Sequence, residues 1–441
     1  MRKLNVLYLV CHLVVLPFSN HLGSQDFLPL VQKTWQHNDV LKAKNFQLES
    51  VGSALAEARA MYGPDISFGM QYTLAAGGRS IDIPVGDLLN PVYSTLNNLT
   101  QTNAFPSIKN ASEQFFPNNF YDARIRVKQA VYYPDLAINK RIKQENIRQK
   151  ELEVKAYKRL LVKETMTAYF SVETTKRVIE IYRANDSLLS EVSRSTKSMI
   201  QHGIALPSAL ARIEIQQSSL RASMMESATH HQNALLYFQF VTGESGFENL
   251  NLEELPSLTV TGTQDREELQ QIDIGKNIFS LAMDKENSFY LPRVGAQLDL
   301  GSQDFDFGFQ PYVLFGLNME VNLFDAKKHR HRKSSFKSEY MALENQKQYA
   351  EDQFELQQQI TRKNAETAIE MADTYRERIV SAERLYQDIY KKYKEGTANY
   401  LELLDAQTQV TQTKIQYNLA RQNAWMKWTD HVYASASFPI L

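Results

Sequence analysis

A long heptad repeat in the second half of the chain most strongly limits the folds that this sequence can adopt. Apolar residues recur every seven positions along two adjacent seams, Ala365, Ala372, Ile379, Tyr386 and Tyr393 on one and Ala368, Tyr375, Ala382 and Ile389 on the other. Such a sustained repeat predicts a coiled coil. After Gly396 a second series begins, with Leu403, Val410, Tyr417 and Ala424 flanked by Ala406, Thr413 and Ala420. Its small residues favour a closely packed antiparallel partner, so Gly396 is predicted to lie at the tip of a helical hairpin.

The helical segments are longer than those of an ordinary globular domain. Helical periodicity covers about residues 136–250 and 326–432. A helix over residues 326–395 would rise on the order of 100 Å at about 1.5 Å per residue. The chain has 441 residues, 43% hydrophobic and 22% charged, and is long for one compact domain. These lengths favour an extended molecule over several globular domains.

Four stretches outside the helical segments alternate between apolar and polar residues, which is the pattern of two-faced β-strands. Their apolar positions are Ile66, Phe68, Met70, Tyr72 and Leu74; Ile125, Val127 and Val131; Val294, Ala296, Leu298 and Leu300; and Val313, Phe315, Leu317, Met319, Val321 and Leu323. The opposite positions carry charges or amides such as Arg124, Arg126, Lys128, Arg293, Gln297, Asp299, Asn318, Glu320 and Asn322. We therefore predict four strands, each with an apolar and a polar face.

The two halves of the chain look like copies, one over residues 25–255 and one over residues 256–441. Each would hold a helix, two strands and a long helical hairpin. The prolines that open the strand pairs, Pro64 and Pro292, are 228 residues apart, whereas the hairpin tips at Gly203 and Gly396 are 193 apart. An insertion of about 35 residues in the loop over residues 75–122 explains the difference.

The first residues predict export from the cytoplasm. Arg2 and Lys3 precede an apolar run over residues 4–16, and small residues follow at Gly23 and Ser24, so residues 1–24 read as a cleaved secretory signal. Cys11 lies within that run, without the small residue that usually precedes a lipid-attachment cysteine. The mature chain is then expected to have no cysteine and no disulfide. No segment after residue 30 has the length and apolarity of a membrane-spanning helix, so any entry into a membrane must use the strands.

Four amphipathic strands are too few to close a barrel, and an open sheet edge in lipid leaves backbone groups unpaired. Several chains would therefore have to share one barrel. Three chains would give twelve strands, an even number within the range of outer-membrane barrels that leave an aqueous lumen. The apolar faces would meet lipid and the polar faces water.

The sequence resembles the TolC family of outer-membrane efflux proteins from about residue 30 to about residue 434. The motifs are Ala56-Glu57-Ala58-Arg59, Tyr290-Leu291-Pro292, Val321-Asn322-Leu323-Phe324-Asp325 and, most specific, KKYKEGTANYLELLDAQTQV over residues 391–410. The resemblance implies an α+β fold in which a shared trimeric β-barrel in the outer membrane continues into a long periplasmic α-helical barrel. It also implies an exit duct for a tripartite efflux or secretion system, with no enzymatic activity and no cofactor. The implied partners are two further copies of the chain, outer-membrane lipid, a periplasmic adaptor and, indirectly or by tip contact, an inner-membrane transporter.

The resemblance also implies a gate near the hairpin tips. Family members narrow the tunnel with inward carboxylates spaced i and i+3, and these positions match Glu402 and Asp405. Without the resemblance, Glu402 reads as an acid favoured at a helix start and Asp405 as a solvated residue. A latch tyrosine of the family matches Tyr393, which also completes the heptad seam. The arginine and aspartate that accompany the latch in the best-known member fall on Ala398 and Ala209, so that ion-pair lock is absent.

The hairpin tips match the surface on which the family docks its periplasmic adaptor. They consist of Gly203, Ile204, Ala205 and Leu206 in the first half and Gly396, Thr397 and Ala398 in the second. Small and apolar residues there permit close packing of helix ends. An ordinary glycine-terminated hairpin would look the same.

Other signals for chemistry are weak. A net charge of −1 gives no bulk electrostatic reason to expect nucleic acid or an anionic membrane surface as a partner. The basic run over residues 327–333 contains His329 and His331, but residues two apart do not share a helix face, so a basic collar near lipid headgroups fits better than a metal site. Gly243-Glu244-Ser245-Gly246 lacks the spacing of a nucleophile elbow, and no phosphate loop or metal-ligand cluster is present.

The alternatives are a non-conducting coiled-coil scaffold or adaptor of the cell envelope, which needs no lipid-facing stripes, and an envelope hydrolase, which needs a pocket of acids and bases. The sequence names no cargo.

Overall fold

The computed structural model describes residues 27–114, 118–250, 252, 255–258, 266–438 and 440. The predicted signal at residues 1–24 lies outside the described residues. The chain divides into two compact units, a helical unit (Met1–Glu49, Arg148–Lys276 and Ala342–Leu441) and a sheet unit (Ser50–Ile147 and Asn277–Met341). Each unit contains segments from both halves of the sequence.

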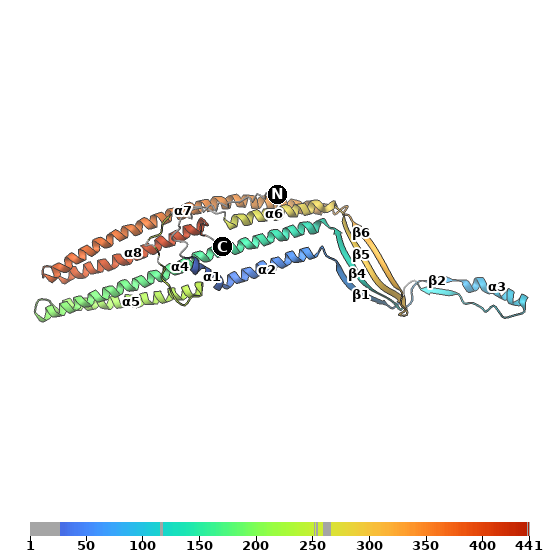
Figure 1. Ribbon diagram of the computed structural model, residues 1–441, viewed down its shortest axis with the longest axis horizontal. Helices are drawn as coiled ribbons and strands as arrows, with labels where there is room; N and C mark the ends of the chain where they lie inside the picture. Colours follow the sequence, from blue (N-terminus) through green and yellow to red (C-terminus); the bar gives the residue numbers. More distant parts are fainter. Residues whose placement is uncertain are drawn as a thin grey trace, which may run out of the picture. The chain divides into compact units, whose positions relative to one another are not determined.

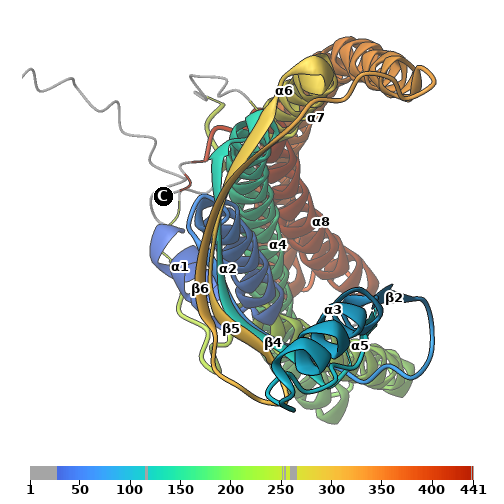
Figure 2. The same ribbon diagram turned by 90° about the vertical axis from the view of Figure 1, so that its right-hand side faces the viewer.

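The sheet unit contains one four-stranded antiparallel sheet (Figures 1 and 2). Its order is β1 (Asp65–Thr73), β4 (Phe120–Tyr132), β5 (Arg293–Phe305) and β6 (Pro311–Glu320). The four predicted strands are confirmed, although the last one ends three residues before Leu323. β6 stops at this point because Glu320 lies opposite Arg293, the first residue of β5, and the preceding Pro292 has no N–H to extend the ladder.

The segment between β1 and β4 is more ordered than the loop that its composition predicts. It contains the two-stranded sheet of β2 (Ser80–Ile83) and β3 (Ala111–Gln114) and the helix α3 (Val85–Thr100). The amide of Asn90 donates to the Ile108 carbonyl at 2.9 Å and accepts from the Ile108 N–H at 2.8 Å. Asn97 makes the same pair of bonds with Phe105, at 2.8 and 3.0 Å. The side chains of these two asparagines thus satisfy backbone groups of the returning segment and hold that segment against α3.

Long helices continue from the strands. They are α1 (Leu28–His37), α2 (Asp39–Ala60), α4 (Pro134–Gln201), α5 (Pro207–Thr242), α6 (Glu267–Asn287), α7 (Lys328–Lys394) and α8 (Tyr400–Ala434), with the short 3₁₀ turn η1 (Ser288–Tyr290) after α6. α4 with α5 and α7 with α8 form the two predicted helical hairpins (Figure 1). None of the described helices is long and apolar enough to cross a membrane.

An aromatic cluster forms the core of the helical unit. The Phe27 and Tyr169 rings meet edge to face at 5.2 Å, and the Phe170 and Trp425 rings stack at 4.9 Å. Burying side chains of this size stabilises the fold by roughly 1.5–3 kcal/mol each. Burial also raises the pKa of Tyr169 to about 12, while its hydroxyl accepts a hydrogen bond from the Leu250 N–H at 2.9 Å.

Small residues on the predicted heptad seams bring α7 and α8 close together. Ala365, Ala368 and Ala372 of α7 are buried, as are Leu403, Ala406, Thr413 and Ala424 of α8. Ala368, Ala372 and Ala424 belong to one buried cluster. The buried seam confirms the periodicity, because these alanines leave no room for solvent between the helices.

Candidate functional site

The four-stranded sheet has one apolar face and one largely polar face. The register aligns Ile66, Val127, Leu298 and Phe315 in one row, and the neighbouring row contains Ser67, Arg126, Asp299 and Leu314. On the edge strands the apolar residues are exposed, in β1 at Ile66, Phe68 and Met70 and in β6 at Val313, Phe315, Leu317 and Met319. One face of the sheet therefore presents a continuous apolar stripe, and among the described residues no side chain covers its edge strands.

Charges are paired on the opposite face. The Arg126 guanidinium donates to both carboxylate oxygens of Asp299, at 2.9 and 2.8 Å, from the adjacent strand. Gln297 donates to the same carboxylate at 3.0 Å, and Arg124 lies 3.3 Å from Asp122. Bidentate pairs of this kind fix the register of neighbouring strands and suit a hydrated surface.

Both edges of this sheet are open. β1 and β6 each pair with only one strand among the described residues. Each edge therefore carries a row of backbone N–H and C=O groups that a further strand can pair with.

The two hairpins turn in the same way at their tips. Gly203 and Gly396 both have φ of +74°, a left-handed conformation that favours glycine. The N–H of Ile204 bonds to the Met199 carbonyl at 2.8 Å, and that of Thr397 bonds to the Lys392 carbonyl at 2.9 Å. These are the Schellman bonds that close a helix at a glycine. The Ile204 and Leu206 side chains are exposed at the first tip, Ala205 and Ala398 are half-buried, and Thr397 is exposed at the second.

Tyr393, the predicted latch residue, is buried between the hairpins. Its hydroxyl lies 3.1 Å from the Thr196 hydroxyl of α4. Tyr393 packs in a cluster with Val192, Ile213 and Leu403, against which Met199 and Ala398 also pack. The positions matching the family's charged latch, Ala209 and Ala398, provide only apolar contact. This cluster holds the ends of the two hairpins together within one chain.

Glu402 and Asp405 both lie exposed on the first turns of α8. Asn399 is the N-cap residue of α8: its side-chain oxygen accepts from the Glu402 N–H at 3.0 Å, and its side-chain amide donates to the Glu402 carboxylate at 2.9 Å. Glu402 is therefore an acidic residue at a helix start, as the alternative to a gate role predicts. These two carboxylates are exposed, whereas Tyr393 is buried in the cluster that contains Val192, Ile213 and Leu403.

Buried polar contacts that sequence analysis missed join α4 to α8. Arg421 lies 3.0 Å from the Glu173 carboxylate, which also accepts from Arg177 at 3.0 Å. Closer to the tips, the Gln407 amide donates to the Asn185 side chain at 2.8 Å. Gln407, Lys414 and Arg421 recur every seven residues. This polar stripe beside the apolar seam is the sequence pattern from which polar contacts between the helices could have been predicted.

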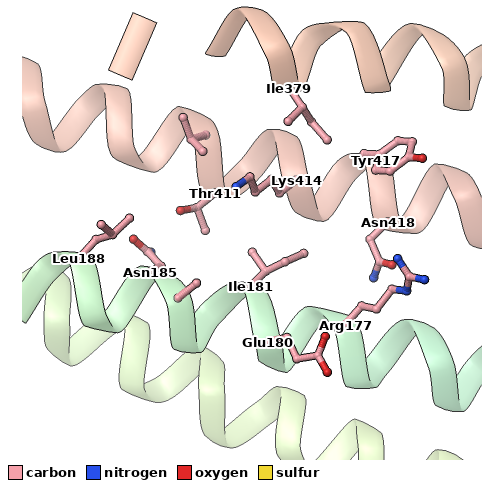
Figure 3. A pocket seen from close by; sticks show the side chains of 12 residues that line it. Arg177, Glu180, Ile181, Asn185, Leu188, Ile379, Thr411, Lys414, Tyr417 and Asn418 are labelled. Atoms are coloured by element: carbon pink, nitrogen blue, oxygen red, sulfur yellow. The ribbon is translucent and has the colours of Figure 1, made fainter. Parts of the chain in front are cut away.

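A pocket of about 380 Å³ lies between α4 and the α7–α8 pair (Figure 3). Ile181 and Leu188 of α4 and Ile379 of α7 supply its apolar lining, and Lys414 and Asn418 of α8 supply polar groups. Lys414 is paired with Glu383 at 2.6 Å, and Asn418 donates to the Thr174 carbonyl at 2.9 Å. Because its polar groups are already engaged in these contacts, the pocket is a gap between packed helices and does not present an array of reactive groups. Within the described part of the chain, no three His, Cys, Asp or Glu side chains gather to hold a metal ion.

Comparison with known proteins relates this architecture to outer-membrane channels. Residues 281–428 match the family described as "Outer membrane efflux protein". No curated protein sequence matches the chain.

The following solved structures have similar folds and are distant in sequence. The CmeC outer membrane channel of Campylobacter jejuni is 12% identical with a TM-score of 0.71, over 94% of this chain and 86% of CmeC. The outer membrane protein VceC of Vibrio cholerae is 13% identical with a TM-score of 0.71, over 95% of this chain and 98% of VceC. The MtrE outer membrane channel of Neisseria gonorrhoeae is 12% identical with a TM-score of 0.71, over 93% and 88%. Residues 281–428 thus match an outer membrane efflux protein domain, and the chain as a whole has the fold of these channels.

Proposed function

We propose that three copies of this chain form an exit duct in the outer membrane of a diderm bacterium, through which substrates leave a tripartite efflux or secretion system. The observation that carries this proposal is the sheet with one exposed apolar face, one charged face and two open edges. In lipid, each unpaired backbone group at such an edge would cost several kcal/mol. Pairing β6 of one copy with β1 of the next removes every edge, and three copies give a closed barrel of twelve strands.

The long helical hairpins would continue this barrel as an α-helical tunnel in the periplasm. In this proposal the segments 25–255 and 256–441 are two repeats, and each supplies two strands and one hairpin. The similar order of elements and the matching glycine turns at Gly203 and Gly396 support the repeat.

The exposed tips would dock a periplasmic adaptor, which in turn connects the duct to an inner-membrane transporter. Ile204 and Leu206 offer exposed apolar contacts next to a glycine turn, a surface suited to packing another helical hairpin. Tyr393 would hold the tips of a closed duct together through its contact with Thr196, without the charged latch of the best-known family member.

Glu402 and Asp405 would form the selectivity ring of the gate. Both are exposed, and three chains would bring six carboxylates toward the axis. Fixed negative charge at a constriction favours cations over anions, most strongly at low ionic strength.

A non-conducting envelope scaffold is the second candidate. The long coiled coils fit it, but the apolar stripe on β1 and β6 has no use in a scaffold that stays in water.

Planar lipid bilayers separate these functions. The purified protein should produce discrete, stable conductance steps with a preference for cations, whereas a scaffold would leave the membrane electrically silent. Glu402→Gln with Asp405→Asn should reduce cation preference and weaken block by multivalent cations. Asp352→Asn with Glu355→Gln is a matched control, since these acids of α7 are also exposed and spaced i and i+3. Equal selectivity in the two double variants would refute the role of Glu402 and Asp405, and an absence of conductance would refute the duct.

A further inference from the structure

A cluster of unpaired cations lies where the last strand passes into α7. Lys327, Lys328, Arg330, Lys333 and Lys337 are exposed, and within the described residues none of them has an acidic partner within ion-pair distance. Their neighbour Arg332 is paired with Glu286 at 2.9 Å. The first turn of α7 contains no acidic residue, so these cations oppose the helix dipole and repel one another. An anionic partner from outside the chain would relieve this repulsion.

The start of α7 is held in a defined position. Ala326 and Lys327 have φ of 54° and 67°, which turns the chain sharply after the strand. The Asp325 carboxylate accepts from the His329 N–H at 2.7 Å and bonds to its ring at 2.8 Å. The buried His329 ring in turn stacks on Phe289 at 4.2 Å. These contacts fix the N-terminal end of α7, on which the cations lie.

The apolar stripe of the sheet leads directly into this cluster. Leu323 and Phe324 are 81% and 83% exposed, and Lys327 follows Phe324 by three residues, a span of at most about 10 Å. Tyr132 and Tyr290 are exposed at the same end of the sheet. The headgroup layer on each side of a bilayer is roughly 5–8 Å thick, and aromatic residues favour that layer. Cations at this distance from the end of the stripe match the depth of lipid phosphates.

We propose that residues 327–333 bind the phosphate groups of anionic phospholipids in the leaflet that faces α7, an inference that rests on the proposed membrane position of the sheet. Lys327, Lys328 and Lys333 supply point charges, and the Arg330 guanidinium supplies a fork that fits two phosphate oxygens. Lys337 lies further along the helix and adds only long-range attraction. The ligand is a phosphatidylglycerol-like headgroup in a bilayer, and its binding holds the strand-to-helix junction at the membrane surface.

Tryptophan fluorescence in vesicles tests this site. The native Trp35, Trp425 and Trp428 lie in the helical unit, so Phe324→Trp adds a reporter at the end of the stripe and the parent protein supplies the background. Full-length protein is reconstituted in phosphatidylcholine that contains either brominated phosphatidylglycerol or brominated phosphatidylcholine as quencher. The collar variant combines Phe324→Trp with Lys328→Gln, Arg330→Gln and Lys333→Gln. The control replaces Lys391, Lys392 and Lys394 with Gln, removing the same charge from the other end of α7.

The expected result is that phosphatidylglycerol quenches the reporter with an apparent affinity about fivefold or more above that of phosphatidylcholine, since each cation near an anionic surface contributes on the order of 1 kcal/mol. The collar variant should lose this preference and the control should keep it. Equal quenching by both lipids in the Phe324→Trp protein would overturn the lipid site while leaving the membrane position of the sheet intact. An absence of quenching by either lipid would overturn both, and preference lost equally in collar and control variants would reduce the effect to overall charge.

Discussion

Removing Arg421 should destabilise the helical unit, because it would leave a charge buried between α4 and α8. Arg421 and Glu173 are only 3% and 6% exposed, and their charged atoms are 3.0 Å apart. Breaking such a pair from one side typically costs about 3–5 kcal/mol. Arg177 also contacts Glu173 at 3.0 Å from a more exposed position, so Arg421→Leu should cost less, about 2–3 kcal/mol. For a unit of this size, that loss lowers the midpoint of thermal unfolding by roughly 5–10 °C.

Circular dichroism of the detergent-solubilised protein at matched concentration measures this shift. The double variant Glu173→Leu with Arg421→Leu is the control, since replacing a whole buried pair with apolar side chains is often close to neutral. It should recover most of the lost stability. A single variant as stable as the parent, or a double variant less stable than the single one, would refute the assignment of this pair as a stabilising buried contact between the hairpins.

Three further predictions concern the helices and the topology. Gly243→Ala should destabilise the protein more than Gly203→Ala in denaturant unfolding, because both glycines have positive φ but only at Gly243 would a Cβ lie 2.5 Å from the His37 ring; equal losses would contradict the structure there. Burial, and then the nearby Arg362, lower the pKa of His431 from its ordinary value of 6.5, while Glu366 opposes this shift. The contribution of His431 to stability is therefore present above pH 6.5 and is lost as the pH falls through the lower folded pKa. In thermal unfolding experiments, the His431→Gln protein should lose less stability on acidification than the parent protein. In intact cells, an impermeant thiol reagent should label Leu99→Cys but should label Thr397→Cys only after the outer membrane is opened, and the reverse pattern would invert the proposed topology.

The strands and hairpin tips could be predicted from the sequence because short-range rules determine them. Alternation with a period of two marks β1 and β6, and Gly203 and Gly396 occupy left-handed positions that other residues adopt at a cost. The segment between β1 and β4 was predicted wrongly as a loop for the opposite reason. Its asparagines, Asn90 and Asn97, read as loop residues, but they bond to the backbone of a chain segment that returns several residues later.

Most of the contacts that join the hairpins could not be predicted from the sequence. Glu173 and Arg421 are 248 positions apart, and no local pattern selects one partner from the many acids of α4. Tyr393 was expected to have a role at the tip, but its bond to Thr196 depends on how two separate hairpins pack. The gate role of Glu402 and Asp405 stays a prediction, since it depends on how copies of the chain meet around an axis.

The mass of the folded protein in detergent tests the proposed duct most directly, because a sheet with two open edges must find its partners in other chains. Light scattering combined with refractive-index and ultraviolet detection separates the mass of protein from that of bound detergent. We predict three chains per particle, stable on dilution in detergent. A folded monomer that keeps its strand content would contradict the shared barrel and the exit duct built on it.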